Sequence, residues 1–260
     1  MQRFAGRLRA ACAAAILAAG PCAGAASPPP NPVSDWAAIV VAGDDHASHS
    51  GDLTETFDNA RRDVARTLVR KGFTPSNVAQ FSMRPARYPD ARPRLADLDS
   101  IDHALGTLTV RARSGCLIYF TSHGAPEGLA LDDDLVSPRT LAHVIARACA
   151  ARPTVVILSA CYSGVFVPAL KSPDRMILTA ARRDRSSFGC GESDKYPFFD
   201  ACVLETLPAA PDFPSLAPAV RSCVARRERE EDMAPPSEPQ VWIGSRFNTP
   251  RRAFATHAGR

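Results

Sequence analysis

Several common functional signatures are missing from this chain of 260 residues. No CxxC pair occurs, which argues against a zinc ribbon or a thioredoxin-like redox motif. The chain also lacks a glycine-rich phosphate-binding loop, and Tyr162-Ser163-Gly164 lacks the first glycine of the G-x-S-x-G motif of serine hydrolases. The formal net charge is only +4 and is partly carried by the two chain ends, so no nucleic-acid partner is indicated.

Long apolar runs are missing too. The apolar run near the start, Ala10–Ala19, is too short to span a bilayer. It follows several arginines and precedes the A-x-A sequence Ala23-Gly24-Ala25, a layout typical of a secretory signal peptide. We therefore assign residues 1–25 to a signal peptide and residues 26–35 to a Pro-rich linker. The protein is expected to be exported, periplasmic or secreted, with no membrane span.

The cysteines fit an exported protein. Of eight cysteines, Cys12 and Cys22 belong to the predicted signal peptide. Cys22 is not expected to carry a lipid anchor, because Pro21 stands where a small residue is needed. In an oxidising compartment the other six can form disulfides, and the sequence leaves their pairing open. If Cys161 is a free nucleophile, at least one more cysteine must be unpaired. The six are Cys116, Cys149, Cys161, Cys190, Cys202 and Cys223.

Two continuous apolar runs, residues 116–121 and 154–158, are typical of central parallel strands covered on both faces. Between them, Ser137-Pro138 predicts the start of a helix, with serine as N-cap and proline at the first position. A strand–helix–strand order places the two strands parallel in one sheet. The sequence therefore predicts one α/β domain over residues 36–248, with a basic C-terminal tail at residues 249–260.

The remaining elements follow from apolar periodicity and from glycine and proline positions. Further strands are predicted at residues 36–42, 78–82, 176–179 and 240–244, and a hairpin at residues 128–136. Further helices are predicted at residues 54–71, 95–110, 198–207 and 216–227.

Polar residues follow both central strands at the point where each ends. The first strand runs into Thr121-Ser122-His123-Gly124, and the second into Ser159-Ala160-Cys161. Ligands of open α/β sheets bind beyond the carboxyl ends of the strands, so His123 and Cys161 are expected to lie side by side. A histidine can activate a neighbouring thiol as a nucleophile. The N–H groups of Gly124 and Cys161 could then form an oxyanion hole.

Plainer interpretations compete with this one. A lone cysteine at a strand end is often only a small buried residue, and a histidine before glycine is often a turn residue. By pattern alone the two interpretations are evenly balanced. Asp44-Asp45-His46 and Asp132–Asp134 lack known metal-ligand spacings and are predicted to be a polar loop and a hairpin turn. We expect no metal and no cofactor, although Asp44 lies at the edge where a substrate would bind.

The segments around these two residues resemble a known family. Residues 119–124 (YFTSHG) and 158–164 (LSACYSG) are similar to the two signatures of the legumain-like cysteine peptidases, family C13 of the caspase–hemoglobinase clan CD, in its bacterial type. Residues 38–43, 186–190 and 239–245 resemble further segments of the family in the same order. The resemblance implies a caspase–hemoglobinase-like three-layer α/β fold, with a mostly parallel central sheet flanked by helices.

The resemblance also implies roles. Cys161 matches the nucleophile, His123 its acid–base partner, and Gly124 the glycine whose N–H binds the oxyanion. The implied reaction is hydrolysis of a peptide or protein substrate through an acyl-enzyme. Substrate contacts are expected from Asp44, Tyr162, Ser186, Ser187 and Asp200.

Two departures and two alternatives accompany these roles. The Arg-His pair that binds asparagine in legumains has no counterpart, since Glu55-Thr56-Phe57 stands at that place, and Tyr162 replaces the acidic residue after the nucleophile. Asparagine specificity is therefore not expected. A transpeptidase, in which an amine resolves the acyl-enzyme, remains an alternative to a hydrolase. A catalytically silent binding protein that keeps the fold is the second alternative.

Overall fold

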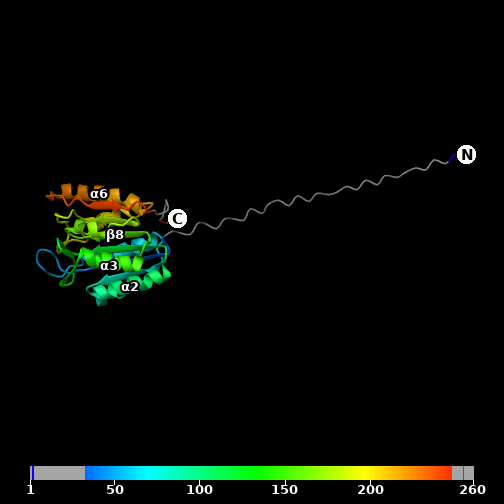
Figure 1. The fold of residues 1–260 in the computed structure, drawn as a ribbon. Helices are drawn as coiled ribbons and strands as arrows, with labels where there is room; N and C mark the ends of the chain where they lie inside the picture. Colours follow the sequence, from blue (N-terminus) through cyan, green and yellow to red (C-terminus); the bar gives the residue numbers. More distant parts are fainter. Residues whose placement is uncertain (1, 3–32, 248–253, 255–260) are drawn as a thin grey trace.

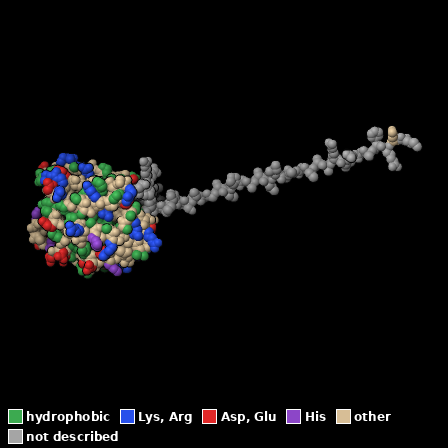
Figure 2. Space-filling model, in the orientation of Figure 1, with side chains coloured by type: hydrophobic (Ala, Val, Ile, Leu, Met, Phe, Trp, Pro, Cys, Tyr) green, Lys and Arg blue, Asp and Glu red, His purple; other side chains and the backbone are tan. Residues whose placement is uncertain are grey.

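The computed structural model describes residues 2, 33–247 and 254. The predicted signal peptide, most of the linker and most of the C-terminal tail lie outside the described residues. Within the described part of the chain, no helix is long and apolar enough to cross a bilayer. On the face shown in Figure 2, basic and acidic side chains are interspersed among apolar ones.

A seven-stranded sheet forms the centre of the domain, in the order β10-β9-β8-β4-β1-β2-β3. All neighbouring strands are parallel except β10, which pairs antiparallel with β9. This confirms the mostly parallel central sheet. The strands are β1 (Trp36–Ala42), β2 (Val78–Ser82), β3 (Arg94–Leu95), β4 (Gly115–Thr121), β8 (Thr154–Ser159), β9 (Arg175–Thr179) and β10 (Gln240–Ile243).

Helices cover both faces of this sheet and complete the three layers (Figure 1). In Figure 1, α6 lies on one side of β8, and α2 and α3 lie on the other. The first face packs on α1 (Thr56–Arg70), α5 (Phe198–Thr206) and α6 (Phe213–Glu230). The second face packs on α2 (Leu98–Arg111), α3 (Pro138–Cys149) and α4 (Phe166–Leu170).

The central strands are buried because their side chains are apolar on both faces. Every residue of β1, β4 and β8 is buried, and alternate residues contribute to opposite cores. Leu117 and Tyr119 of β4 face α1, α5 and α6, whereas Ile118 and Phe120 face α2, α3 and α4. The predicted cap of α3 is present, since the Ser137 side chain accepts a hydrogen bond from the Thr140 N–H.

A small second sheet stands beside the carboxyl end of β4. It contains β5 (Gly124–Ala125), β6 (Gly128–Leu131) and β7 (Asp134–Val136), all antiparallel. The hairpin predicted over residues 128–136 is thereby confirmed, and Asp132 occupies its turn with φ 58°. Strand β5, whose two residues directly follow His123, was not predicted.

One residue of the predicted tail packs into the domain. Phe254 is 3% exposed and its ring meets Phe213 of α6 edge-on, with 4.7 Å between centroids. The Lys71 ammonium group lies 5.0 Å from the centroid of the same ring. The first core therefore includes a contribution from beyond residue 248.

Two disulfides cross-link the domain, one on each side of the sheet: the first joins the sheet to a helix, and the second joins two helices of one layer. Cys116 of β4 pairs with Cys149 at the end of α3, and Cys202 of α5 pairs with Cys223 of α6. Cys161 and Cys190 are free among the described cysteines. The expectation that a second cysteine stays unpaired beside Cys161 is confirmed.

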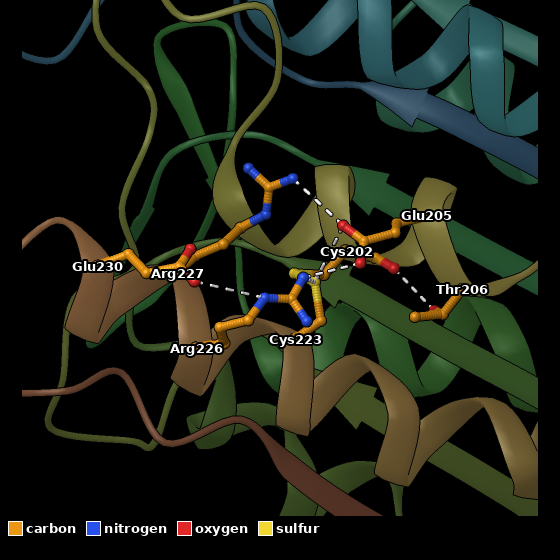
Figure 3. Close-up of a disulfide and its surroundings, with 7 residues drawn as sticks. All are labelled: Cys202, Glu205, Thr206, Cys223, Arg226, Arg227 and Glu230. Atoms are coloured by element: carbon orange, nitrogen blue, oxygen red, sulfur yellow. Dashed lines mark hydrogen bonds and ion pairs between the residues drawn. A yellow bond between two sulfur atoms is a disulfide. The ribbon is translucent and has the colours of Figure 1, made fainter.

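A group of ion pairs lies beside the α5–α6 disulfide (Figure 3). Glu205 of α5 contacts Arg226 at 2.8 Å and Arg227 at 3.3 Å, both on α6. Glu205 and Arg226 are nearly half exposed, so solvent weakens these ion pairs. The covalent bond is therefore the stronger link between the two helices.

We expect the double substitution of Cys202 and Cys223 by alanine to lower the free energy of unfolding by about 3 kcal/mol. The bond closes a loop with a sequence separation of 21 residues, and freeing such a loop raises the entropy of the unfolded chain. Urea denaturation of the oxidised proteins measures the difference. Substitution of the free Cys190 by alanine is the matched control for loss of a cysteine. Equal midpoints for the double variant and the parent would contradict the prediction.

Candidate active site

The carboxyl ends of β4 and β8 place His123 and Cys161 at matching positions. Thr121 and Ser159 are partners in the parallel ladder, and His123 and Cys161 each follow two residues later. The ladder continues one step further, because the Ser122 N–H donates to the Ser159 carbonyl at 3.0 Å. Both residues line one cavity of about 540 Å³.

A tight turn presents Cys161. Tyr162 has φ 57°, the left-handed region that non-glycine residues rarely occupy. Its N–H donates to the Arg185 carbonyl at 2.8 Å, which holds this conformation. The buried Ser163 hydroxyl donates to the Ala160 carbonyl at 2.7 Å and accepts from the Ala181 N–H at 3.2 Å. The turn is therefore fixed to the segment that follows β9.

The Cys161 thiol is held by a neighbouring loop. Its sulfur accepts a hydrogen bond from the Ser187 N–H at 3.2 Å and lies 3.6 Å from the Ser187 hydroxyl oxygen. No hydrogen bond joins the thiol to His123 within the described residues. The two groups share the cavity without touching, and catalytic contacts of this kind often form only with substrate bound.

His123 is oriented by two contacts. Its Nε2 atom lies 2.9 Å from the His46 carbonyl oxygen. A carbonyl only accepts, so Nε2 is the donor, and the neutral ring keeps Nδ1 as the proton acceptor. The Phe57 ring meets the imidazole edge-on, with 5.0 Å between centroids. His123 is therefore held in the tautomer that leaves one nitrogen free to take a proton.

Gly124 lies against the backbone of Cys161. A Cβ atom at this position would stand 2.3 Å from the Cys161 carbonyl oxygen, so only glycine allows this approach. The Ala130 N–H donates to the His123 carbonyl, which makes those two residues a hydrogen-bonded pair. In an antiparallel ladder, hydrogen-bonded and non-hydrogen-bonded pairs alternate, so the next pair, Gly124 and Leu129, is a non-hydrogen-bonded one. The Gly124 N–H consequently points away from β6.

Asp200 lies below the site and not in its cavity. It is fully buried at the start of α5. One carboxylate oxygen accepts from the Tyr119 hydroxyl, and the other from Thr121 at 2.8 Å and Ser159 at 2.6 Å. Burial raises the pKa of Asp200 to about 6, against the lowering effect of the three hydroxyl donors. The carboxylate ties β4 to β8 one side-chain layer below His123 and Cys161.

The other expected substrate contacts divide into two groups. Ser186 and Ser187 line the cavity, whereas Asp44 and Tyr162 are not among its lining residues. One Asp44 oxygen accepts the N–H groups of Asp45 and His46 at 2.7 and 2.9 Å. Asp44, Asp45 and His46 place one potential metal-ligand atom each within 4.8 Å of one another. The side chains of Asp44, Asp45 and His46 interact with one another within the loop. Asp45 also pairs with Arg84 at 3.0 Å.

Known proteins match both the sequence and the fold. Residues 101–207 match the peptidase C13 family. This segment includes His123 and Cys161 and the strands that position them. Over this segment the chain is similar to the peptidase C13 family.

The fold of the chain agrees with that of a solved structure. The crystal structure of caspase-1 from Spodoptera frugiperda superposes with a TM-score of 0.57 over 81% of this chain and 87% of that chain. The identity is 18%, so this likeness concerns the fold. No curated protein sequence matches the chain. The family match supports a cysteine peptidase function, and the expected caspase–hemoglobinase-like fold is confirmed.

Some walls of the cavity were not predicted from the sequence. Glu231 and Met233 come from the segment after α6 and are far from the motifs in sequence. Further lining residues are Ser48, His49, Phe188, Gly189, Cys190, Gly191, Asp194 and Phe198. Phe188, Gly189 and Cys190 fall within the segment that resembles the family, which could have indicated them. Glu231 and Met233 have no local signal.

Proposed function

We propose that the chain is an exported cysteine endopeptidase in which Cys161 is the nucleophile and His123 the acid–base partner. The observation that carries this proposal is the placement of both side chains. Each follows the last paired residue of one of two adjacent parallel strands, and both line one cavity. The family match over residues 101–207 supports the same reaction class.

The first half of the reaction forms an acyl-enzyme. The Cys161 sulfur attacks the carbonyl carbon of the scissile peptide bond, and the thiol proton passes to Nδ1 of His123. The N–H groups of Gly124 and Cys161 stabilise the negative oxygen of the tetrahedral intermediate. The C–N bond then breaks, and the leaving amine takes the proton from His123. The acyl group remains on sulfur as a thioester.

Water completes the cycle. His123, now neutral, accepts a proton from a water molecule as its oxygen attacks the thioester carbonyl. The C–S bond breaks, the thiol regains a proton, and the acid product leaves. The Cys161–Ser187 contact has to loosen during the cycle, because the sulfur must approach the substrate carbonyl within bonding distance.

Export is supported by two features. The signal-peptide layout of residues 1–25 predicts passage through a secretory pathway. Two disulfides among the described residues fit an oxidising compartment, where such bonds form and persist.

A mixed peptide library tests the proposed function. The chain from residue 26 and its Cys161→Ala variant would each be incubated with the library, and cleavage sites read by mass spectrometry. We expect cleavage by the parent alone. Added amines would appear in the products if the chain were a transpeptidase. If the parent cleaves nothing and Cys161 alkylates no faster than an ordinary thiol, the catalytically silent alternative is correct.

A further inference from the structure

The cavity beside Cys161 contains acidic side chains and no basic ones. Asp194 and Glu231 line it from opposite segments, the loop before α5 and the segment after α6. No lysine or arginine is among the described lining residues. The only ionisable nitrogen groups among them are the imidazoles of His49 and His123. At neutral pH the lining is therefore negatively charged.

These two carboxylates lack cationic partners. Neither Asp194 nor Glu231 forms an ion pair within the part of the chain that the structure describes. One Asp194 oxygen accepts the Gly191 N–H at 2.8 Å. Two other acidic groups near the site have arginine partners, since Arg84 pairs with Asp45 at 3.0 Å and Arg87 with Glu55 at 2.5 Å. The carboxylates of Asp194 and Glu231 are therefore available to a cationic group of a ligand.

The pKa of the Cys190 thiol, in the wall of the cavity, is affected by the nearby carboxylates. Burial raises the pKa of its thiol, and the carboxylates of Asp194 and Asp44 raise it further because they disfavour a second negative charge. The effect of Asp44 reaches the wall although Asp44 does not line it. Two carboxylates therefore lie close enough to the cavity wall to act on a charged group there.

The remaining walls are apolar. The rings of Phe188 and Phe198 lie 6.3 Å apart between centroids, and Met233 lines the same cavity. Apolar walls beside unpaired carboxylates suit a side chain with an alkyl stem and a positive end. An acidic side chain would meet repulsion, and a purely apolar one would leave the carboxylates without a partner.

We propose that this cavity binds the substrate side chain on the acyl side of the scissile bond and selects arginine or lysine there. This inference rests on the proposed function, because Cys161 attacks the carbonyl of that same residue. The side chain next to the attacked carbonyl is the one that enters the cavity lined by the nucleophile. Asp194 and Glu231 then pair with its guanidinium or ammonium group.

Peptides that differ only at this residue test the proposal. We expect kcat/KM to be at least about 100-fold higher for arginine or lysine than for aspartate, with leucine and asparagine between them. Asp194→Asn should lower kcat/KM for arginine about tenfold and change that for leucine less than twofold. Glu192→Gln is the matched control, since Glu192 lies in the same loop but accepts the Ser50 N–H outside the cavity.

Two results would overturn the proposal and separate it from the function itself. Cleavage that is fastest after aspartate or leucine would leave the peptidase intact and refute the cationic preference. An equal effect of Asp194→Asn on the arginine and leucine peptides would assign Asp194 a purely structural role and refute its part in selection.

A second measurement does not need peptide cleavage. In a Cys190→Ser background, Cys161 would be modified with a cationic and an anionic methanethiosulfonate, each forming a mixed disulfide and releasing methanesulfinate. The measured quantity is the ratio of the modification rates with the cationic and the anionic reagent. We expect this ratio to be at least about tenfold higher for Cys161 than for free cysteine, and Asp194→Asn to reduce it. A ratio equal to that of free cysteine would refute the negative cavity even if no peptide is ever cleaved.

Discussion

Replacing His123 by alanine is expected to lower kcat/KM for peptide cleavage by about 10²–10⁴-fold, the usual contribution of a positioned general acid–base. The loss should fall mainly on kcat, because the imidazole moves protons and does not hold the substrate. The fold should persist, since the ring is only partly buried and its one hydrogen bond goes to the His46 carbonyl. Steady-state kinetics on the best library peptide measures the effect.

The matched control is His143→Ala, an exposed histidine of α3 on the second face of the sheet. It should leave kcat/KM unchanged. The rate of Cys161 alkylation gives an independent result, because loss of the neighbouring base should slow it. If His123→Ala kept its activity within twofold, another group would have to supply the proton, and the proposed dyad would be wrong.

Asp200 is expected to give the second large effect. Asp200→Leu removes the acceptor of three hydroxyl groups, Tyr119, Thr121 and Ser159. Each buried hydroxyl left without a partner costs about 1–3 kcal/mol, so the free energy of unfolding should fall by at least about 3 kcal/mol. Asp200→Asn should be far milder, because its amide oxygen can accept from Thr121 and Ser159 while its NH₂ group donates to Tyr119.

The two Asp200 variants also separate position from charge at the active site. Thr121 and Ser159 stand two residues before His123 and Cys161, so Asp200→Leu should slow alkylation of Cys161 in the folded fraction. Asp200→Asn, which keeps the bonds, should preserve it. Loss of reactivity in both variants would show that the negative charge itself matters to the thiol.

The pH dependence of stability follows from the raised pKa of Asp200. Its value is about 6 in the folded protein and 3.8 in the reference state, so between these values the folded state binds more protons than the unfolded state. The contribution of Asp200 to stability is therefore greatest below about pH 4 and is lost as the pH rises through 6. A shift of about two units corresponds to roughly 3 kcal/mol.

Urea denaturation of the parent and Asp200→Asn between pH 4 and 7 measures this contribution. As the pH rises from 4 to 6, the free energy of unfolding of the parent should fall relative to that of Asp200→Asn. Above this range the difference between the two proteins should level off. Taking the difference removes the opposite trend from exposed carboxylates that are paired with arginine. Parallel curves for the two proteins would contradict the assigned pKa.

The strands and the neighbouring positions of His123 and Cys161 could be predicted because each rests on local sequence. Continuous apolar runs of β-branched and aromatic residues identified β4 and β8 to within one residue. The rule that parallel strands present their carboxyl ends at one edge then brought His123 and Cys161 together. The serine–proline start of α3 was equally local.

Other features depend on contacts between distant segments. The disulfide pairing depends on the packing of β4 against α3 and of α5 against α6, which the sequence alone does not define. Helix α6 starts at Phe213, three residues before the predicted start, because Asp212 caps it through the Ser215 N–H and the helix tolerates Pro218. The role of Asp200 was not predicted. Its carboxylate, on α5, accepts hydrogen bonds from three hydroxyl groups of β4 and β8, and no spacing in the sequence indicates these contacts.

The distribution of the cysteines has a practical consequence for handling the protein. The four bonded sulfurs belong to residues at most 2% exposed, whereas Cys161 and Cys190 are partly exposed. Thiol–disulfide exchange requires access to the sulfur. A small, mild reductant will therefore meet the two free thiols long before it opens either cross-link. Purification can keep Cys161 reduced while both disulfides stay closed, provided the protein remains folded throughout.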